Sequence, residues 1–292
     1  MHGNDYISFD ELSARNPEAA EHGDADFYLL QSDFVARYAL GNLSELLAAI
    51  PFKSIRLRVD NNDEHHRNET TSGIGDLRLG GKRYLISNDS VQLAGLVGLN
   101  VPTGKLNNTA ATSYLGHEEA ADLGIDVPAH NHAQLGTGTF YPFIGIDSLF
   151  HLDQRWMLLG SIQAELPFYK NKYGYKTSTS GTFSLGPALR VESMRSVFSL
   201  FAEAFYSGRD HFSDETIEGT NGSVGGDFWV PNTGRFEVAL KPGVTWNVSP
   251  KITLNLRGRI AISTQIRTES AGRDVQLSEP FGLLMSITLT PR

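Results

Sequence analysis

Cysteine is missing from all 292 residues of the sequence, and long apolar runs are missing as well. Without cysteine, disulfide scaffolds, thiolate metal sites and cysteine nucleophiles are excluded. A membrane-spanning helix needs about 18 or more consecutive apolar residues, whereas the longest apolar-rich stretch, VQLAGLVGLNV at 91–101, contains polar breaks. The first residues, MHGNDYISFDE, lack the basic and apolar regions of a signal peptide, so we expect that any such peptide has been removed.

The sequence also lacks an excess of basic residues. Its 25 Lys and Arg stand against 33 Asp and Glu, which gives a formal net charge of -8. A phosphate-binding surface needs clustered Lys and Arg, so we expect no nucleic-acid partner. Glycine-rich phosphate loops followed by a helix are absent too, and we therefore expect no nucleotide cofactor or other cofactor.

What the sequence does have is a series of long segments in which apolar and polar residues alternate. Such alternation, with many β-branched and aromatic residues and with turn residues at the ends, predicts β-strands. The predicted strands are 26–40, 43–57, 73–86, 91–103, 136–150, 155–169, 179–193, 197–207, 233–247, 251–264 and 279–290.

The connections between these strands alternate between two lengths. Short turns are predicted at 41–42, 87–90, 151–154, 193–196 and 247–250, and long polar loops at 58–72, 104–135, 170–178, 208–232 and 265–278. This order is typical of an up-and-down barrel that gathers its tight turns at one rim and its long loops at the other. A sandwich with Greek-key crossovers gives no reason for such sorting.

The segment KITLNLRGRIAIST at 251–264 shows the sidedness of the strands. Ile252, Leu254 and Leu256 share one face, while Asn255 and Arg257 share the other. A strand that crosses a bilayer needs about 9–11 residues, against five or six in most globular strands. We therefore predict an all-β fold, a transmembrane up-and-down antiparallel β-barrel of about 12 strands; a soluble sheet with solvated outer charges is the alternative.

Eleven predicted strands are one short of the even number in single-chain bacterial barrels. Either the region before residue 26 supplies a strand, or one segment is miscounted. We divide the chain into an N-terminal segment at 1–25 and a barrel at 26–292. The stretch SFDELSARNPEAAE places Ser8 and Glu11 at capping-box spacing, which indicates a short helix that lies inside the barrel as a plug or beneath it, with a flexible tail as the alternative.

The inward faces of the predicted strands carry charges of both signs and several aromatic rings. Across a lumen too wide for apolar side chains to fill, we expect opposed charges that pair and stay partly hydrated. The predicted lumen and solute pathway consists of Asp33, Arg37, Asp76, Arg78, Lys82, Tyr141, Phe143, Glu165, Arg190, Phe201, Glu203, Phe205, Glu237, Lys241, Arg257 and Arg259, with Asp147 as a further inward charge.

Three short motifs follow one another in the first half of the chain. They are Gly73, Gly75 and Asp76, then Pro102, Thr103 and Gly104, and, after the longest loop, Gly136, Thr137 and Gly138. In these motifs the chain resembles the bacterial outer-membrane family labelled putative MetA-pathway of phenol degradation, whose members are often described as transporters. The likeness covers roughly residues 27–290, and the family's Ile-Pro strand end is matched by Ile50 and Pro51.

This resemblance implies an outer-membrane channel or uptake barrel. From the residues themselves, the glycine pairs at Gly73 and Gly75 and at Gly136 and Gly138 are expected to shape one rim, by barrel curvature rather than by ligand contact. We expect Asp76, with Arg78 and Lys82 nearby, to pin an inward loop. One feature departs from many such barrels, because the chain ends in SITLTPR and not in an aromatic residue.

Enzymatic alternatives have weaker support. The loops contain His65, His66, His117, His130, His132 and His211, but acidic, histidine-rich surface loops are more often solvated than metal-bound, so metal binding stays open. Lipid-acting barrel enzymes pair a serine with a nearby histidine, and the segment EGTNGSVGG has Asn221, Gly222 and Ser223 without one.

We therefore expect no enzyme but a porin-like barrel in the outer membrane of a Gram-negative bacterium. Its partners would be outer-membrane lipids and a small, hydrophobic or aromatic solute that it takes up, and we expect a monomer. A lipid-acting barrel enzyme, or an adhesion barrel that binds through its long loops at 104–135 and 208–232, are the alternative functions.

Overall fold

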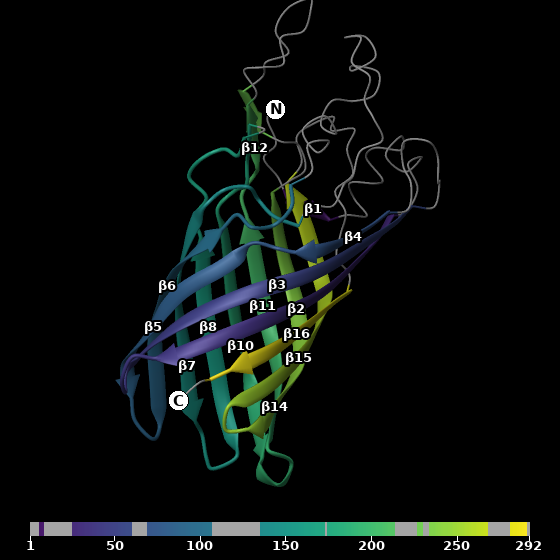
Figure 1. Cartoon of the computed structure of the whole chain (residues 1–292). Coiled ribbons are helices and arrows are strands. Elements are labelled where there is room, and N and C mark those ends of the chain that lie inside the picture. The colour runs from purple at the N-terminus through teal and green to yellow at the C-terminus, as the bar shows by residue number, and fades with distance from the viewer. Residues whose placement is uncertain are drawn as a thin grey trace, which may run out of the picture.

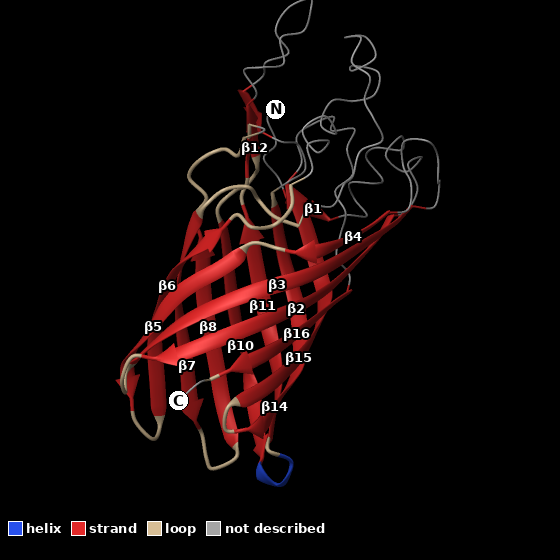
Figure 2. Ribbon diagram, viewed as in Figure 1, coloured by secondary structure: helices blue, strands red, loops and turns tan. Residues whose placement is uncertain are grey.

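The computed structural model describes residues 6–8, 25–59, 69–106, 135–172, 174–213, 227–229, 234–267 and 281–290. Within these ranges the chain is almost entirely β-strand, and its one helical element is the 3-10 turn η3 at Glu192–Met194 (Figure 2). No helix in the described part of the chain is both long and apolar enough to cross a membrane.

Eleven strands form a closed, tilted barrel (Figure 1). In chain order they are β2 (Ala25–Ala39), β3 (Ser44–Val59), β5 (Leu77–Ser87), β6 (Val91–Val101), β7 (Tyr141–His151), β8 (Trp156–Glu165), β10 (Ser180–Val191), β11 (Ser196–Ser207), β14 (Arg235–Ser249), β15 (Ile252–Arg267) and β16 (Phe281–Leu289). Each strand pairs antiparallel with its neighbours in the sequence, which confirms the predicted up-and-down barrel.

The barrel closes through a parallel pair. Strand β16 runs beside β2 with Gly282 opposite Leu29 and Leu289 opposite Ala36. When strands alternate in direction, an odd number of them leaves the first and the last running the same way, so an eleven-membered ring has to close in parallel. The predicted number of about 12 is reached through β1 (Tyr6–Ser8), which pairs with the upper end of β15 beyond β16.

The short strand β1 also answers the question of the missing strand, since it comes from the region before residue 26. Ser8, the expected helix cap, belongs to β1, and the rest of the expected helix lies outside the described residues.

The connections sort as the sequence predicts. The short turns lie at one end of the barrel, and the strand ends that lead into the long connections lie at the other end (Figure 1). Side chains hold the short turns: the Asn88 carbonyl oxygen accepts hydrogen bonds from the backbone N–H groups of Ser90 and Val91. The Asp153 carboxylate accepts bonds from Arg155 and Trp156 at 2.7 Å each. These bonds from the N–H groups of Trp156 and Arg155 lower the pKa of Asp153.

Two of the predicted strands start later than expected. The segment predicted as one strand at 73–86 is divided into β4 (Glu69–Ile74) and β5, because the chain bends at Gly75 and Asp76. The upper part of β3 pairs with β4 and its lower part pairs with β5. The strand predicted at 136–150 begins at Tyr141, since residues 135–140 form a turn in which Gly138 has a positive φ of 73°.

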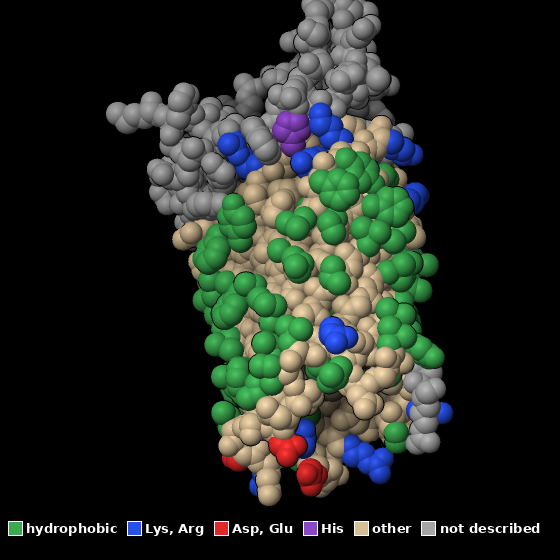
Figure 3. All heavy atoms as spheres, turned by 90° about the vertical axis from the view of Figure 1, so that its left-hand side faces the viewer, with side chains coloured by type: hydrophobic (Ala, Val, Ile, Leu, Met, Phe, Trp, Pro, Cys, Tyr) green, Lys and Arg blue, Asp and Glu red, His purple; other side chains and the backbone are tan. Residues whose placement is uncertain are grey.

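The outer wall of the barrel is apolar. Large apolar side chains at alternate strand positions are exposed on it, including Phe34, Ile50, Val97, Ile144, Ile162, Phe183, Leu200, Trp246, Leu256 and Ile260. Figure 3 shows many green side chains on the face of the barrel that is turned to the viewer. Charged side chains gather toward the two ends, with one blue side chain between them. Such a band fits a lipid environment, because a monomeric soluble protein rarely exposes a continuous apolar surface of this extent.

A small second sheet extends the long-loop end. Its strands are β9 (Tyr175–Lys176), β12 (His211–Ser213) and β13 (Asp227–Trp229), with β12 in the middle. Figure 1 shows β12 above the rim of the barrel. This sheet ties the loop after β8 to the loop after β11.

Candidate lumen site

Successive inward positions of the strands carry the charged groups that form the centre of the site. On β11 and β14 these are Glu203, Glu237 and Lys241, and β15 adds Arg259. Lys241 Nζ lies 2.7 Å from Glu203 Oε2, and Arg259 Nε lies 3.5 Å from Glu203 Oε1. Arg259 also pairs with Glu237, a residue that is 1% exposed. A buried carboxylate needs such partners because an unpaired charge in the interior is very costly.

A second group of ion pairs lies on the opposite part of the wall. Lys82 Nζ on β5 lies 2.8 Å from Asp147 Oδ2 on β7. Arg78 Nη1 lies 3.4 Å from Glu165 Oε1 on β8, and the Glu165 carboxylate also accepts a bond of 3.3 Å from the amide of Gln163. The Lys82–Asp147 pair crosses one intervening strand, β6, and the Arg78–Glu165 pair crosses two, β6 and β7.

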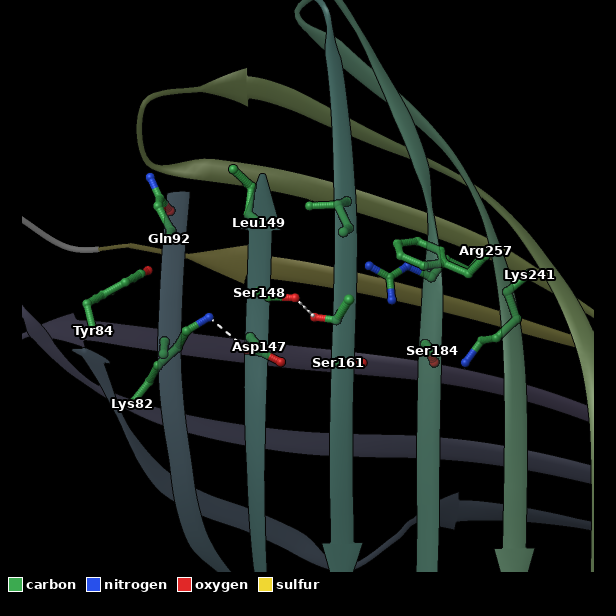
Figure 4. A pocket seen from close by; sticks show the side chains of 14 residues that line it. Lys82, Tyr84, Gln92, Asp147, Ser148, Leu149, Ser161, Ser184, Lys241 and Arg257 are labelled. Carbon is green, nitrogen blue, oxygen red and sulfur yellow. Dashed lines mark hydrogen bonds and ion pairs between the residues drawn. The ribbon is translucent and has the colours of Figure 1, made fainter. Parts of the chain in front are cut away.

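A cavity of about 440 Å³ opens between the two groups, inside the barrel (Figure 4). Four charged side chains line it, namely Lys82, Asp147, Lys241 and Arg257. The rest of the lining is part polar and part apolar: Gln92, Ser148, Ser161, Ser184, Tyr84, Ala94, Leu149, Leu159, Gly160 and Phe201. The cavity is therefore of a size and composition that suits a small molecule.

A smaller cavity of about 270 Å³ lies nearer the long-loop end. Tyr141, Glu165, Phe205 and Arg235 line it together with Asp210. Burial raises the pKa of the Asp210 carboxyl, although Tyr175 and the backbone N–H of Ser178 donate hydrogen bonds to it. On β11 the inward residues Phe201, Glu203 and Phe205 follow one another, so the Glu203 ion pairs lie between the two cavities.

The four aromatic residues predicted for the lumen differ in their contacts. Tyr141 lines the smaller cavity, and the other three lie beside arginines. Phe201 and Phe205 stack under arginines, with Arg257 Cζ 5.5 Å and Arg235 Cζ 4.9 Å from the ring centres. Phe143 is 1% exposed beneath Arg78 and packs over Gly80 and Gly98, where an added Cβ would lie 2.9 and 2.2 Å from its ring. Phe143 thus fills the wall and does not line either cavity.

Three other predicted residues do not join these groups. Asp33 on β2 accepts a hydrogen bond of 2.9 Å from the Gln31 amide. Arg37 is exposed near the short-turn end of β2. Arg190 is exposed near the end of β10, where its guanidinium lies 3.9 Å from the sulfur of Met157.

Asp76 lies at the long-loop rim, where the three glycine-containing motifs meet. Its carboxylate accepts bonds from the Gly104 N–H at 3.0 Å and from the N–H and hydroxyl of Thr137 at 2.8 Å each. The Thr103 hydroxyl adds a bond of 2.9 Å to the Gly75 carbonyl and accepts one from the Leu77 N–H. We call this set the rim knot; it comprises Gly75, Asp76, Thr103, Gly104, Gly136 and Thr137. Asp76 therefore holds both ends of the connection between β6 and β7 at the rim, and it makes no contact with Arg78 or Lys82.

Glycine is required where the chains cross in the rim knot. A Cβ on Gly136 would lie 2.5 Å from Asp76 Oδ1 and 2.7 Å from the Gly104 backbone, and a Cβ on Gly104 would lie 2.6 Å from Gly136. Real Cβ atoms do not approach backbone so closely. The sequence indicated that Gly136 shapes the rim, but not that it lies against Gly104.

Sequence analysis missed the neutral polar residues of the main cavity. Gln92, Ser161 and Ser184 occupy inward positions of β6, β8 and β10. The alternation that identified the inward charges also places these residues inward, but their short, uncharged side chains gave no separate signal. Ser184 donates a hydrogen bond of 3.1 Å to Glu203 and so orients that carboxylate.

The histidine and serine candidates are mostly outside the described residues. This holds for His65, His66, His117, His130, His132 and Ser223. His211 lies in β12 and pairs through its backbone with Trp229 and Lys176. The described residues contain no group of three or more side chains that could hold a metal ion.

A scan against models of protein families finds no match, and neither does a search of curated proteins. A search of solved structures finds the crystal structure of the COG4313 outer membrane channel from Pseudomonas putida F1. The similarity covers 81% of this chain and 77% of that chain, at 14% sequence identity and a TM-score of 0.53. At this identity the likeness concerns the fold. It agrees with the barrel that the family resemblance implied, while the family label stays a prediction.

Proposed function

We propose that this chain is an outer-membrane channel that lets a small hydrophobic or aromatic solute pass through its lumen. The observation that carries the proposal is the reversed sidedness of the barrel. Leu256 and Ile260 are exposed on the outer wall, whereas Arg259 and Glu237 are buried inside. A water-soluble barrel would bury the first pair and expose the second, so lipid outside and water inside fit this arrangement best.

The two lumenal cavities support passage of a solute and not a merely structural role. They lie one above the other along the inner wall, separated by the ion pairs of Glu203. A pore whose walls offer several weak contacts lets a solute enter and also leave. The rings of Phe201 and Tyr84, which line the larger cavity, suit a solute with an apolar or aromatic body.

The remaining parts of the proposal concern the protein's surroundings. The apolar outer wall supports outer-membrane lipid as its partner, and the solved channel with the same fold is itself an outer-membrane protein. The barrel closes on itself through β16 and β2 without help from a second chain, which supports a monomer. Passage through the lumen involves no bond-making step, so the proposal includes neither catalysis nor a cofactor.

Conductance of the purified protein in planar lipid bilayers tests this proposal. We expect discrete current steps, and we expect a neutral aromatic solute such as phenol to reduce the current by occupying the lumen. Heat-denatured protein serves as the control. Folded barrels that insert but carry no current would contradict a channel and favour an adhesion role. Lipid hydrolysis that is lost in Ser223→Ala would favour a barrel enzyme instead.

A further inference from the structure

The main lumenal cavity carries more positive than negative charge, although the whole chain has a net charge of -8. Its lining contains Lys82, Lys241 and Arg257 against the single carboxylate of Asp147. Lys82 is paired with Asp147 at 2.8 Å, and Lys241 is paired at 2.7 Å with Glu203, just outside the lining. Arg257 is therefore the one cation of the lining that forms no ion pair with a described residue.

The Glu203 and Asp147 carboxylates attract Arg257 without forming an ion pair with it, so its guanidinium has no direct partner among the described residues. It makes no ion pair with any of them, and its buried Nε has no hydrogen-bond partner among them. Its guanidinium stacks near the Phe201 ring at 5.5 Å. Both carboxylates already pair with other cations, Glu203 with Lys241 and Arg259 and Asp147 with Lys82.

A guanidinium with free donors inside a low-dielectric wall is a strong attraction for an anion. Arginine presents its donors as a planar fork that matches the two oxygens of a carboxylate. In Figure 4 the guanidinium of Arg257 reaches into the cavity toward the strands that carry Ser161 and Ser184. The Ser161 hydroxyl offers a further donor on the same side, whereas that of Ser184 already donates to Glu203.

We propose that this cavity is an anion subsite that binds a small organic monocarboxylate with an apolar body. Arg257 receives the carboxylate, Lys241 adds positive charge, and Phe201 and Leu159 contact the body of the ligand. Asp147 disfavours dianions, because a second negative charge would lie close to its carboxylate. The inference rests on the proposed function, since the ligand reaches this cavity only through a water-accessible lumen.

Binding to the full chain in detergent tests the subsite without the need for current. Isothermal titration with benzoate is compared with titration of benzamide, its uncharged counterpart. We expect benzoate to bind at least about tenfold more tightly, since a hydrogen-bonded charge pair contributes roughly this factor. Arg257→Gln should remove the preference, Arg257→Lys should retain part of it, and Arg155→Gln, an equal loss of charge in an exposed turn, should leave it unchanged.

The reversal potential in a tenfold KCl gradient provides the second test. We expect the wild type to prefer chloride over potassium and Arg257→Gln to lose that preference, while Arg155→Gln keeps it. Equal affinity for benzoate and benzamide in the wild type would overturn the subsite, whether or not the variants fold. Tight, Arg257-dependent benzoate binding without any conductance would confirm the subsite but overturn the proposed channel. Selectivity that is unchanged in a folded Arg257→Gln would overturn the subsite and leave the channel intact.

Discussion

Asp76 is the residue on which the long-loop rim depends most. Its buried carboxylate, just before β5, joins the two ends of the long β6–β7 connection through three hydrogen bonds. Bonds to an ionised acceptor are stronger than neutral ones, and a buried donor that loses its acceptor pays its full desolvation cost. The rim knot thus depends mainly on this carboxylate, while the Thr103 hydroxyl adds one bond to the Gly75 carbonyl and one from the Leu77 N–H.

We predict that Asp76→Ala lowers the free energy of unfolding by about 3 kcal/mol, because it leaves three donors near Gly104 and Thr137 without their acceptor. Urea unfolding of the protein in detergent micelles measures this loss. Asp89→Ala, in an exposed short turn, is the matched control and should change the stability by less than about 0.5 kcal/mol. Equal effects of the two substitutions would show that Asp76 has no special role.

Gly136 provides a second test of the rim knot that leaves Asp76 in place. In Gly136→Ala the new methyl group would lie 2.5 Å from Asp76 Oδ1 and 2.7 Å from the Gly104 backbone, so the loops must separate. We expect a loss of about 2 kcal/mol in the same unfolding assay, typical of overpacking. Gly181→Ala is the control, since its Cβ would find the nearest atom at 3.8 Å. A stable Gly136→Ala variant would contradict the close crossing.

Sequence alone could predict which residues share one face of a strand but not which of them pair. Alternation along a strand fixes the face of Glu203 or Lys241, because successive side chains point to opposite sides. The partner of each charge depends on which strands are neighbours and on their register. The alternation within one strand specifies neither. For the same reason, the contact of Asp76 with Thr137, 61 positions away, could not be foreseen.

At the scale of the strands, the parallel pair of β16 and β2 is the least regular part of the barrel. Ten of the eleven contacts in the ring are antiparallel hairpin pairs, and this one alone joins the two ends of the ring. Parallel pairs are slightly less stable per residue. We call this pair the seam. The ring has an odd number of strands because β16 pairs directly with β2.

An engineered disulfide tests the seam, because the natural chain has no cysteine to compete. Ser32 and Met285 are opposite each other in the register. We predict that Ser32→Cys with Met285→Cys forms an intramolecular disulfide on mild oxidation, detected by a shift in gel mobility that a reductant reverses. Leu30→Cys with Met285→Cys is offset by two positions, too far for a disulfide, and should remain reduced. Efficient crosslinking of the offset pair would contradict the parallel register.

The positions of the strands were largely predictable, and the exceptions have local causes. Period-two alternation located all eleven strands of the ring. It also extended two predicted strands, 73–86 and 136–150, into the residues of the rim knot. There, the glycines at 73, 75, 136 and 138 support bends that a pattern of apolar residues does not reveal. The parallel closure could not be predicted because it joins segments some 250 positions apart.

At the scale of the whole molecule, the account depends on two environments that meet across one wall of the barrel. The outer face offers Leu256, Ile260 and Trp246 to lipid, and the inner face offers ion pairs and cavities to water and solute. A wall one strand thick separates the two. The two environments are thus encoded in the alternation of residues along each strand and not in the overall composition.

Thiol labelling of single cysteines in proteoliposomes tests this division most directly. On β15 the adjacent positions Asn255 and Leu256 lie on opposite faces of the wall. We predict that a water-soluble, membrane-impermeant thiol reagent modifies Asn255→Cys at least about tenfold faster than Leu256→Cys, and that a lipid-soluble reagent reverses this order. Equal labelling of both positions, or faster labelling of Leu256→Cys from water, would contradict a lipid-facing outer wall around a water-filled lumen.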